Sequence, residues 1–448
     1  MHPFLPHTDR DIQEMLDFCG LQKPEELFAD IPEDVLLKKN LPLADGLSEF
    51  EAFRLLEKTA AKNRIESVCF LGCGSYDHII PRTVNRITSL PQFYTAYTPY
   101  QAEMSQGFLQ AMFEFQTMIC ELTSLEVSNA SLYDGHTASC EAAVMALQAC
   151  RDRNKVLYAE TLHPFTKQVL RTHFYGTDVV LKEVQAPSGC FSLAALEEEL
   201  DDDTACFIGQ SPNIFGFLED YTGCAEALHA RGAFFIISSN PLSLAVTRSQ
   251  GEWGADIGIG DTQVFGLPRF FGGPSCGYIA ATEKLTRKMP GRIVGQSVDT
   301  KGRRAFILTL QAREQHIKRH RATSNICSNQ ALAALASTVY LSLLGPEGLK
   351  ETALQNMAAA RYLYDRLTAL PGITGYAGNP FFNEFTLQLP KPAEQVAAEI
   401  LKRGILAGVP YKTLDSRGSE NLLVVAVTEK RTRDELEAYA EALQEVTA

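Results

Sequence analysis

Two short apolar runs flank a glycine-rich loop in the segment Gly254-Ala-Asp-Ile-Gly-Ile-Gly-Asp-Thr-Gln-Val-Phe-Gly-Leu-Pro-Arg-Phe-Phe-Gly-Gly-Pro-Ser-Cys-Gly277. The first run covers residues 257–259, and the second covers residues 277–281. Runs of this length between glycines and prolines are typical of buried strands. No lysine occurs between Lys182 and Lys284. We therefore predict a strand, a lysine-free loop and a second strand.

Further apolar runs precede this segment and alternate with helical patterns; they cover residues 156–159, 178–184, 206–209 and 234–238. A helix is expected after Ser105, because apolar residues recur there every three or four positions, and another over residues 137–151. This alternation predicts an α/β fold with a mainly parallel sheet and helices on both faces. In such sheets ligands bind beyond the carboxyl ends of the strands.

Three parts of the chain differ in pattern. Residues 1–62 read as an N-terminal helical arm, with a helix from Thr8 to a stop at Gly20 and a capping box, Ser48-Glu-Phe-Glu51, that opens a second helix. Such an arm is expected to pack across a partner or a neighbouring domain. Residues 63–326 form the large α/β domain.

Residues 327–448 are predicted to form a smaller C-terminal α+β domain. Its helices are expected at residues 328–344, 346–370, 393–403 and 433–446, and its strands at residues 382–389 and 421–427. Gly345-Pro346 separates the first two helices, and the capping box Thr432-Arg-Asp-Glu435 opens the last one.

Composition excludes several classes of function. The formal net charge is −13 without a basic run, which argues against a surface for nucleic acid or anionic membranes. No apolar stretch reaches the ~18 residues of a membrane span, and the N-terminus lacks the features of a signal peptide. The 11 cysteines follow no framework spacing, so most are expected to be reduced and buried. We expect a cytoplasmic protein.

The motif Tyr133-Asp-Gly-His-Thr-Ala-Ser-Cys-Glu-Ala142 places Gly135, Thr137 and Ser139 at the start of a predicted helix. Free backbone N–H groups and the helix dipole favour an anion at such a position. One interpretation is a phosphate-binding cup or its remnant. The other is an ordinary glycine turn with a threonine N-cap, and the motif alone leaves both open.

A polar loop over residues 93–107 precedes the helix that starts near Ser105. So many hydroxyl and amide groups in one loop favour recognition of a small polar ligand. The alternative is a surface loop with half-buried tyrosine rings. The candidate residues are Tyr97, Thr98, Tyr100, Gln101 and Glu103.

A second polar segment, residues 311–328, precedes the helix expected at residue 328. Thr323, Ser324 and Asn325 could donate hydrogen bonds to a phosphate, including one across a subunit boundary. His316 and His320 lie one helical turn apart, but no further ligands stand nearby, so a solvated or interface helix face is favoured over a metal site.

Four motifs resemble one enzyme family, and the likeness runs over essentially the whole chain. The family is glycine dehydrogenase (decarboxylating), the P-protein of the glycine cleavage system. The motifs are Tyr97-Thr-Pro-Tyr-Gln-Ala-Glu-Met-Ser-Gln-Gly107, Asn129-Ala-Ser-Leu-Tyr-Asp-Gly135, Gly272-Gly-Pro274 and Arg313-Glu-Gln-His-Ile-Lys-Arg-His-Arg-Ala-Thr-Ser-Asn-Ile-Cys327.

The resemblance implies the fold of type I transferases that depend on pyridoxal phosphate (PLP). The family combines two related units, and the lysine that forms a Schiff base with PLP belongs to the C-terminal one. Leu267-Pro-Arg-Phe-Phe-Gly-Gly-Pro274 lines up with the sequence after that lysine, which puts Gln263 near its place. Residues 234–246 also lack the aspartate that usually pairs with the pyridine nitrogen. The chain thus resembles a separate N-terminal unit without the cofactor lysine.

The resemblance also implies a reaction and partners. A lysine-bearing subunit 2 would hold PLP, and the complex, with two copies of each subunit, would decarboxylate glycine and pass the aminomethyl group to the lipoyl arm of the H-protein. Tyr97, Thr98, Tyr100 and Gln101 would contribute loop contacts, and Thr323 and Ser324 would contact the partner's PLP phosphate. His136 departs from the family pattern, which has a small residue there, and its role stays open.

Two other interpretations remain. The chain could be a structural or regulatory pseudoenzyme that contributes no group to its partner's site. It could instead be a self-sufficient homodimer with cysteine or histidine chemistry, which would be active alone.

Overall fold

The computed structural model describes residues 4–39, 41–63, 68–150, 152–269 and 272–447. It divides into two compact units, Met1–Ile65 and Glu66–Ala448. The first unit holds the helices α1 (Asp9–Cys19) and α2 (Glu49–Ala60) and the 3-10 helix η1 (Pro24–Phe28). Thr8 and Ser48 cap the two α-helices in reciprocal capping boxes. Both predicted N-terminal helices are confirmed.

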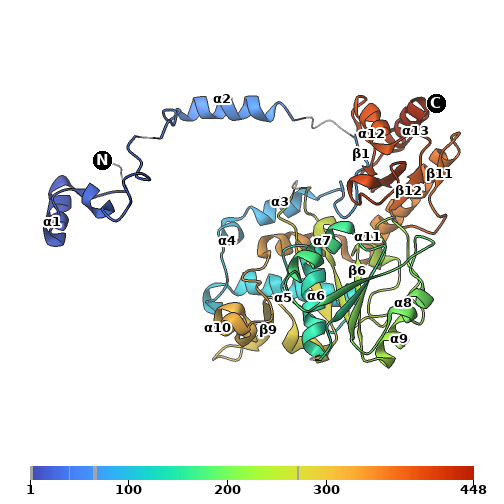
Figure 1. Ribbon diagram of the computed structural model, residues 1–448, viewed down its shortest axis with the longest axis horizontal. Helices are drawn as coiled ribbons and strands as arrows, with labels where there is room; N and C mark the ends of the chain where they lie inside the picture. Colours follow the sequence, from blue (N-terminus) through green and yellow to red (C-terminus); the bar gives the residue numbers. More distant parts are fainter. Residues whose placement is uncertain (1–3, 40, 64–67, 151, 270–271, 448) are drawn as a thin grey trace. The chain divides into compact units, whose positions relative to one another are not determined.

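A sheet of seven strands forms the centre of the second unit, in the order β2-β8-β7-β6-β5-β3-β4. Figure 1 labels one of its strands, β6. Strands β3 to β7 pair in parallel, whereas β8 runs antiparallel to both β7 and β2. The mainly parallel sheet is therefore confirmed. The strands are β2 (Val127–Ser128), β3 (Lys155–Ala159), β4 (Val180–Val184), β5 (Thr204–Gln210), β6 (Phe234–Ser239), β7 (Ile257–Asp261) and β8 (Gly277–Ala281).

Helices cover both faces of this sheet. Alternate strand residues point to opposite faces, and apolar side chains on each face pack against helices. Ile208 and Ile236 pack with α6 (Gly135–Ala149) and α7 (Pro164–His173). Phe207 and Phe235 pack in a separate cluster with α8 (Leu193–Glu199) and α9 (Cys224–Ala230). Asp134 caps α6, since its carboxylate accepts a hydrogen bond of 2.7 Å from the amide of Thr137. The threonine N-cap, one of the two interpretations that the motif left open, is therefore wrong.

Two long helices, α5 (Gln106–Thr123) and α11 (Ala331–Thr368), share a third hydrophobic cluster with β8. The predicted separation of two helices at Gly345-Pro346 appears as a kink within α11, where Gly345 has φ 60°. By length and composition α11 could cross a membrane, contrary to the expectation that no apolar stretch is long enough. Its residues Ala334, Tyr340 and Leu349 lie in the protein core, where soluble proteins also place such helices.

The C-terminal part contains a second, antiparallel sheet in the order β11-β12-β15-β14. Its hydrophobic core joins both central strands to the end of α11 and to two further helices. The predicted α+β elements are thus present, while the boundaries at 62/63 and 326/327 stay predictions. The elements are β11 (Thr374–Gly375), β12 (Glu384–Gln388), β14 (Val409–Pro410), β15 (Leu422–Ala426), α12 (Ala393–Leu401) and α13 (Arg433–Thr447).

Several short elements lie outside the sequence prediction. The strands β9 (Ile293–Val298) and β10 (Arg304–Thr309) form a hairpin, and β1 (Val68–Cys69) pairs with the distant β13 (Ile405–Leu406). A two-residue strand carries no periodic signal, and its partner cannot be read from local sequence. The short helices are α3 (Arg82–Thr88), α4 (Pro91–Tyr94) and α10 (Gln315–Lys318).

The helix face expected for His316 and His320 is wrong. Helix α10 ends at Lys318, and His320 lies in the following 3-10 turn, where Arg319 has φ 56°. Among the described residues no group of three His, Cys, Asp or Glu side chains could hold a metal ion.

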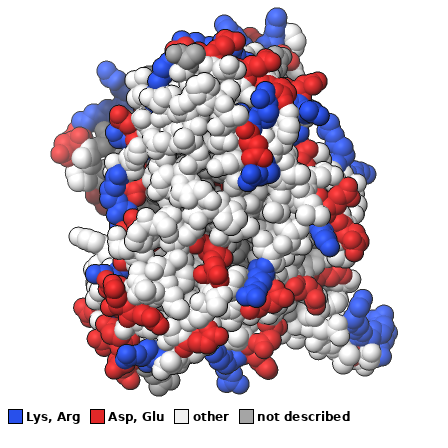
Figure 2. All heavy atoms as spheres, turned by 90° about the vertical axis from the view of Figure 1, so that its right-hand side faces the viewer, with Lys and Arg blue, Asp and Glu red and all other residues white. Residues whose placement is uncertain are grey.

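On the face drawn in Figure 2, basic side chains are interspersed with acidic ones.

Candidate functional site

Gln263 follows β7 at the carboxyl edge of the central sheet, in the place where the resemblance implies a lysine. Its side chain is 4% exposed and makes three hydrogen bonds. The amide nitrogen donates to the carbonyls of Tyr76, at 3.0 Å, and Leu267, at 2.9 Å. The amide oxygen accepts from the backbone N–H of Tyr76 at 2.9 Å. A neutral carboxamide therefore occupies this position, and its hydrogen-bond partners all belong to this chain.

Asp261, the last residue of β7, lies beside Gln263 and faces the N-terminus of α6. Its carboxylate accepts hydrogen bonds from the amide of Gly135 at 3.0 Å, the amide of Gln263 at 2.9 Å and the hydroxyl of Ser275 at 2.6 Å. Burial raises the pKa of Asp261, while these three donors act in the opposite direction. An internal carboxylate thus takes the position that a helix N-terminus offers to an anion.

The other residues of the predicted phosphate cup are also bound within the chain. The hydroxyl of Thr137 donates to Asp134 at 3.1 Å, and that of Ser139 donates to the carbonyl of Gly135 at 2.9 Å. A Cβ atom at Gly135 would lie 3.2 Å from the Cβ of Asp261, so the two segments are in close contact. The residues at this edge therefore do not fit a covalently held PLP, since the amine is missing and a carboxylate faces the helix.

His136 belongs to an aromatic group at the same edge. Its ring centroid lies 4.8 Å from that of His163 and 6.2 Å from that of Phe165, and its Nδ1 is 2.8 Å from the hydroxyl of Thr166. The Nδ1 of His163 accepts from the amide of Phe165, so its Nε2 donates to the carbonyl of Cys73 at 3.1 Å. Burial and the neighbouring His136 lower the pKa of His163 to about 3. His163 is therefore neutral.

The predicted tyrosine loop lies on the surface. Tyr97 is 83% exposed, and neither its hydroxyl nor the side chains of Thr98, Gln101 and Glu103 hydrogen-bond with any described residue. Tyr100 is 53% exposed, and its hydroxyl accepts a hydrogen bond of 3.1 Å from Arg292. Of the five candidates, Tyr100 is thus the one whose side chain is held in place.

Arg292, which sequence reasoning missed, connects the tyrosine loop to the segment before α11. The side chain is 3% exposed, and its guanidinium donates to the carbonyl of Cys327 at 2.9 Å as well as to Tyr100. It also lies 3.8 Å from the carboxylate of Glu314 and 5.3 Å from the ring centroid of Tyr100. The two predicted polar segments are therefore brought together through a buried arginine.

The three phosphate candidates lie beside α6. The carbonyl of Thr323 accepts from Gln148 at 3.3 Å, and the hydroxyl of Ser324 accepts from the amide of Ile326 at 3.1 Å. Burial raises the pKa of Glu141 to about 7, while Ser324 acts in the opposite direction. Asn325 is exposed, and its side chain makes no hydrogen bond with the described residues. The hydroxyl of Thr323, a half-buried residue, has no such bond either.

Glu384 of β12 joins the small sheet to this site. Its carboxyl group accepts hydrogen bonds from the amide of Cys73 at 2.6 Å and from the hydroxyl of Tyr76 at 3.0 Å. Gln263 holds the backbone of the same Tyr76, so one loop connects β12 to the edge of the central sheet. Burial raises the pKa of Glu384 to about 7.

The raised pKa of Glu384 predicts a stability that depends on pH. A carboxyl group that binds its proton more tightly in the folded state stabilises the fold fully below its ordinary pKa of 4.5 and loses that contribution as pH rises through about 7. Glu384→Gln removes this dependence. Between pH 4.5 and pH 8, the unfolding free energy of the variant should rise relative to that of the wild type by up to about 3 kcal/mol, measured by urea unfolding. Glu441→Gln is the control, because Glu441 is exposed. If the unfolding free energies of the wild type and of Glu384→Gln changed in parallel with pH, the assignment would be contradicted.

Removal of the Asp261 carboxylate should destabilise the protein. Asp261→Ala leaves the amides of Gly135 and Gln263 and the hydroxyl of Ser275 without their acceptor, which predicts a loss of about 2–4 kcal/mol of unfolding free energy. Asp178→Ala serves as the control, because the Asp178 side chain is exposed and makes no hydrogen bond with the described residues. Equal unfolding midpoints for the two variants would show that Asp261 does not hold the site.

The chain is similar to known proteins over nearly its whole length. The sequence pattern of the family described as "Glycine cleavage system P-protein" matches residues 2–443. The probable glycine dehydrogenase (decarboxylating) subunit 1 of Carboxydothermus hydrogenoformans is 48% identical over 442 residues, which cover 98% of this chain and 99% of the relative. A crystal structure of the glycine cleavage system's glycine decarboxylase (P-protein), in inhibitor-bound form, matches with a TM-score of 0.89 and 42% identity, covering 99% of this chain and 100% of that chain.

A more distant structure shows how widely the fold is shared. A sphingosine-1-phosphate lyase from Burkholderia pseudomallei matches with a TM-score of 0.66 at 14% identity, covering 94% of this chain and 93% of that chain. The fold is that of type I PLP-dependent enzymes, as predicted. With matches along nearly its whole length, this chain belongs to the glycine cleavage system P-protein family.

Proposed function

We propose that this chain is the subunit of a glycine decarboxylase complex that holds no cofactor itself. The observation that carries the proposal is the pair Asp261 and Gln263: a carboxylate faces the N-terminus of α6, and a fully bonded amide follows β7. A lysine-bearing subunit 2 would hold PLP covalently and supply its electron sink for decarboxylation. The match to relatives called subunit 1 supports the existence of such a partner.

In this proposal the chain lends surface groups to the partner's site. Tyr100 is half-exposed with its hydroxyl fixed by Arg292, so it can present a defined hydrogen-bonding group to a ligand. The free hydroxyl of Thr323 can donate to a phosphate of the partner's PLP, with Ser324 and Asn325 beside it. The complex, with two copies of each subunit in the cytoplasm, would release CO2 from glycine and pass the aminomethyl group to the lipoyl arm of the H-protein.

Reconstitution tests the proposal. We expect no release of CO2 from carboxyl-labelled glycine by this chain alone, and release by its mixture with a lysine-bearing subunit and H-protein. Size-exclusion chromatography of the co-expressed chains checks that a complex forms. Activity of this chain alone, equal to that of the mixture, would contradict the proposal and favour the self-sufficient homodimer.

Substitutions in the two polar segments separate a contributing subunit from a purely structural partner. Loss of one hydrogen bond to glycine in Tyr100→Phe should raise KM about 3- to 10-fold, and loss of one charged hydrogen bond in Thr323→Ala should weaken PLP retention about 10-fold or more. Tyr175→Phe is the control, because Tyr175 is 90% exposed and lies outside the site. Complexes of both variants with unchanged glycine affinity and PLP retention would favour the structural role.

A further inference from the structure

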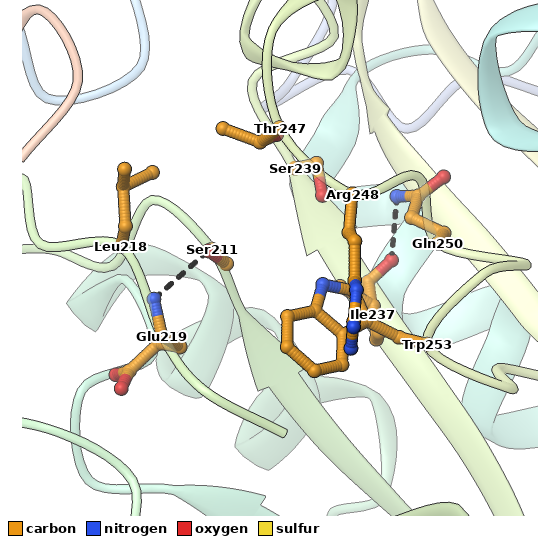
Figure 3. Close-up of a pocket in the computed structure, with 9 residues that line it drawn as sticks. All are labelled: Ser211, Leu218, Glu219, Ile237, Ser239, Thr247, Arg248, Gln250 and Trp253. Carbon is orange, nitrogen blue, oxygen red and sulfur yellow. Dashed lines mark hydrogen bonds between the residues drawn. The ribbon is translucent and has the colours of Figure 1, made fainter. Parts of the chain in front are cut away.

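A cavity opens at the carboxyl edge of the central sheet, beyond β5 and β6 (Figure 3). Its volume is about 270 Å³. Ser211 follows β5, and Ile237 and Ser239 belong to β6. The remaining walls come from Leu218 and Glu219 and from the segment that contains Thr247, Arg248, Gln250 and Trp253. Neither Gln263 nor Asp261 lines this cavity, so it is distinct from the edge that faces α6.

Arg248 supplies an available positive charge at this cavity. Its guanidinium carbon lies 4.6 Å from the centroid of the Trp253 ring, and the side chain runs alongside the indole in Figure 3. The side chain is exposed and makes no hydrogen bond or ion pair with any described residue. Stacking on an aromatic face leaves the N–H groups at the guanidinium edge free for a planar carboxylate.

The acidic groups near Arg248 are largely engaged elsewhere. The carboxylate of Glu219 accepts from Asn213 at 2.7 Å, from the amide of Phe191 at 2.8 Å and from Thr161 at 3.1 Å. Glu252 accepts from the amide of Ser249 at 2.8 Å. The pKa of Asp220 is lowered mainly by hydrogen bonds from Thr222, with a smaller effect of Arg248. Two exposed carboxylates, Asp220 and Glu252, and the buried Glu219 thus lie near an incoming anion, but none of them forms an ion pair with Arg248. Burial raises the pKa of Glu219, which disfavours its charged form.

Three hydroxyls line the cavity beside its apolar walls, and two of them are engaged: that of Ser211 accepts from the amide of Glu219 at 3.1 Å, and that of Thr247 donates to the carbonyl of Ser243 at 2.9 Å. Ser239 is 6% exposed, and its hydroxyl has no hydrogen-bond partner in the described part of the chain. Ile237, Leu218 and the indole of Trp253 supply the apolar surface. The volume equals roughly nine water molecules, which suits a ligand of about the size of isovalerate. A single cation and mostly apolar walls favour a carboxylate with an apolar body over a phosphate.

We propose that this cavity binds a small organic monocarboxylate. The carboxylate lies against the guanidinium edge of Arg248 and accepts a hydrogen bond from Ser239, and the apolar body packs on Trp253 and Leu218. This ligand site is independent of glycine decarboxylation and of the partner subunit, so its test does not depend on the proposed function.

Trp253 provides a direct probe, because it is the only tryptophan in the sequence. The full-length chain is titrated at constant ionic strength with isovalerate, its neutral analogue isovaleramide and inorganic phosphate, and tryptophan fluorescence is recorded. Isovalerate should give a saturable change, with affinity at least about 10-fold above that of the amide and of phosphate, since a charged hydrogen-bonded pair contributes that much.

Variants assign the effect to the cavity. Arg248→Gln should weaken isovalerate binding about 10-fold or more, Ser239→Ala about 3-fold to 10-fold, and Arg287→Gln, an exposed arginine elsewhere, should leave it unchanged. Isothermal calorimetry repeats the affinities without relying on the indole, and thermal unfolding confirms that the variants are folded. The proposal is overturned if no saturable binding occurs, if isovaleramide or phosphate binds as tightly, or if Arg248→Gln matches Arg287→Gln.

Discussion

The carboxylate of Asp261 accepts hydrogen bonds from Gly135 at the start of α6, from Gln263 after β7 and from Ser275 before β8. It thereby fixes three segments that meet at the carboxyl edge of the sheet, where α/β folds usually bind ligands. The carboxylate also accepts the hydrogen bond of the first amide of α6, so a group of the chain itself occupies the N-terminus of that helix. Because that position is filled, the edge is a packed part of the protein, and Gln263 is free to hold Tyr76.

Tyr76 extends this arrangement to the C-terminal sheet. Its backbone is held by Gln263 and its hydroxyl by Glu384, so the position implied for the lysine has become a structural connection between β7 and β12. The groups that remain available lie elsewhere. Tyr100, held by the buried Arg292, is half-exposed, and the hydroxyl of the half-buried Thr323, beside α6, makes no hydrogen bond with the described residues. This division underlies our proposal that the chain shapes a neighbour's site.

Local sequence was sufficient for the regular elements but not for the contacts of the site. The capped helices α1 and α2 and the strands β3 to β8 follow from caps, periodicity and apolar runs. The sequence also shows that no lysine lies near Gln263 in the chain. The roles of Asp261, Arg292 and Glu384 were not, because their partners lie 126, 192 and 308 residues away in the chain. One signal was present: a carboxylate directly after a buried strand is expected at the ligand-binding edge.

The location of the cofactor can be measured in the assembled complex. Borohydride reduction of the PLP-loaded complex converts a covalent link between PLP and a lysine into a stable pyridoxyl adduct, and mass spectrometry of the separated chains locates it. We expect one stoichiometric pyridoxyl group on the lysine-bearing subunit and none on this chain. A stoichiometric adduct on this chain would contradict the account of Asp261 and Gln263 given by the structure.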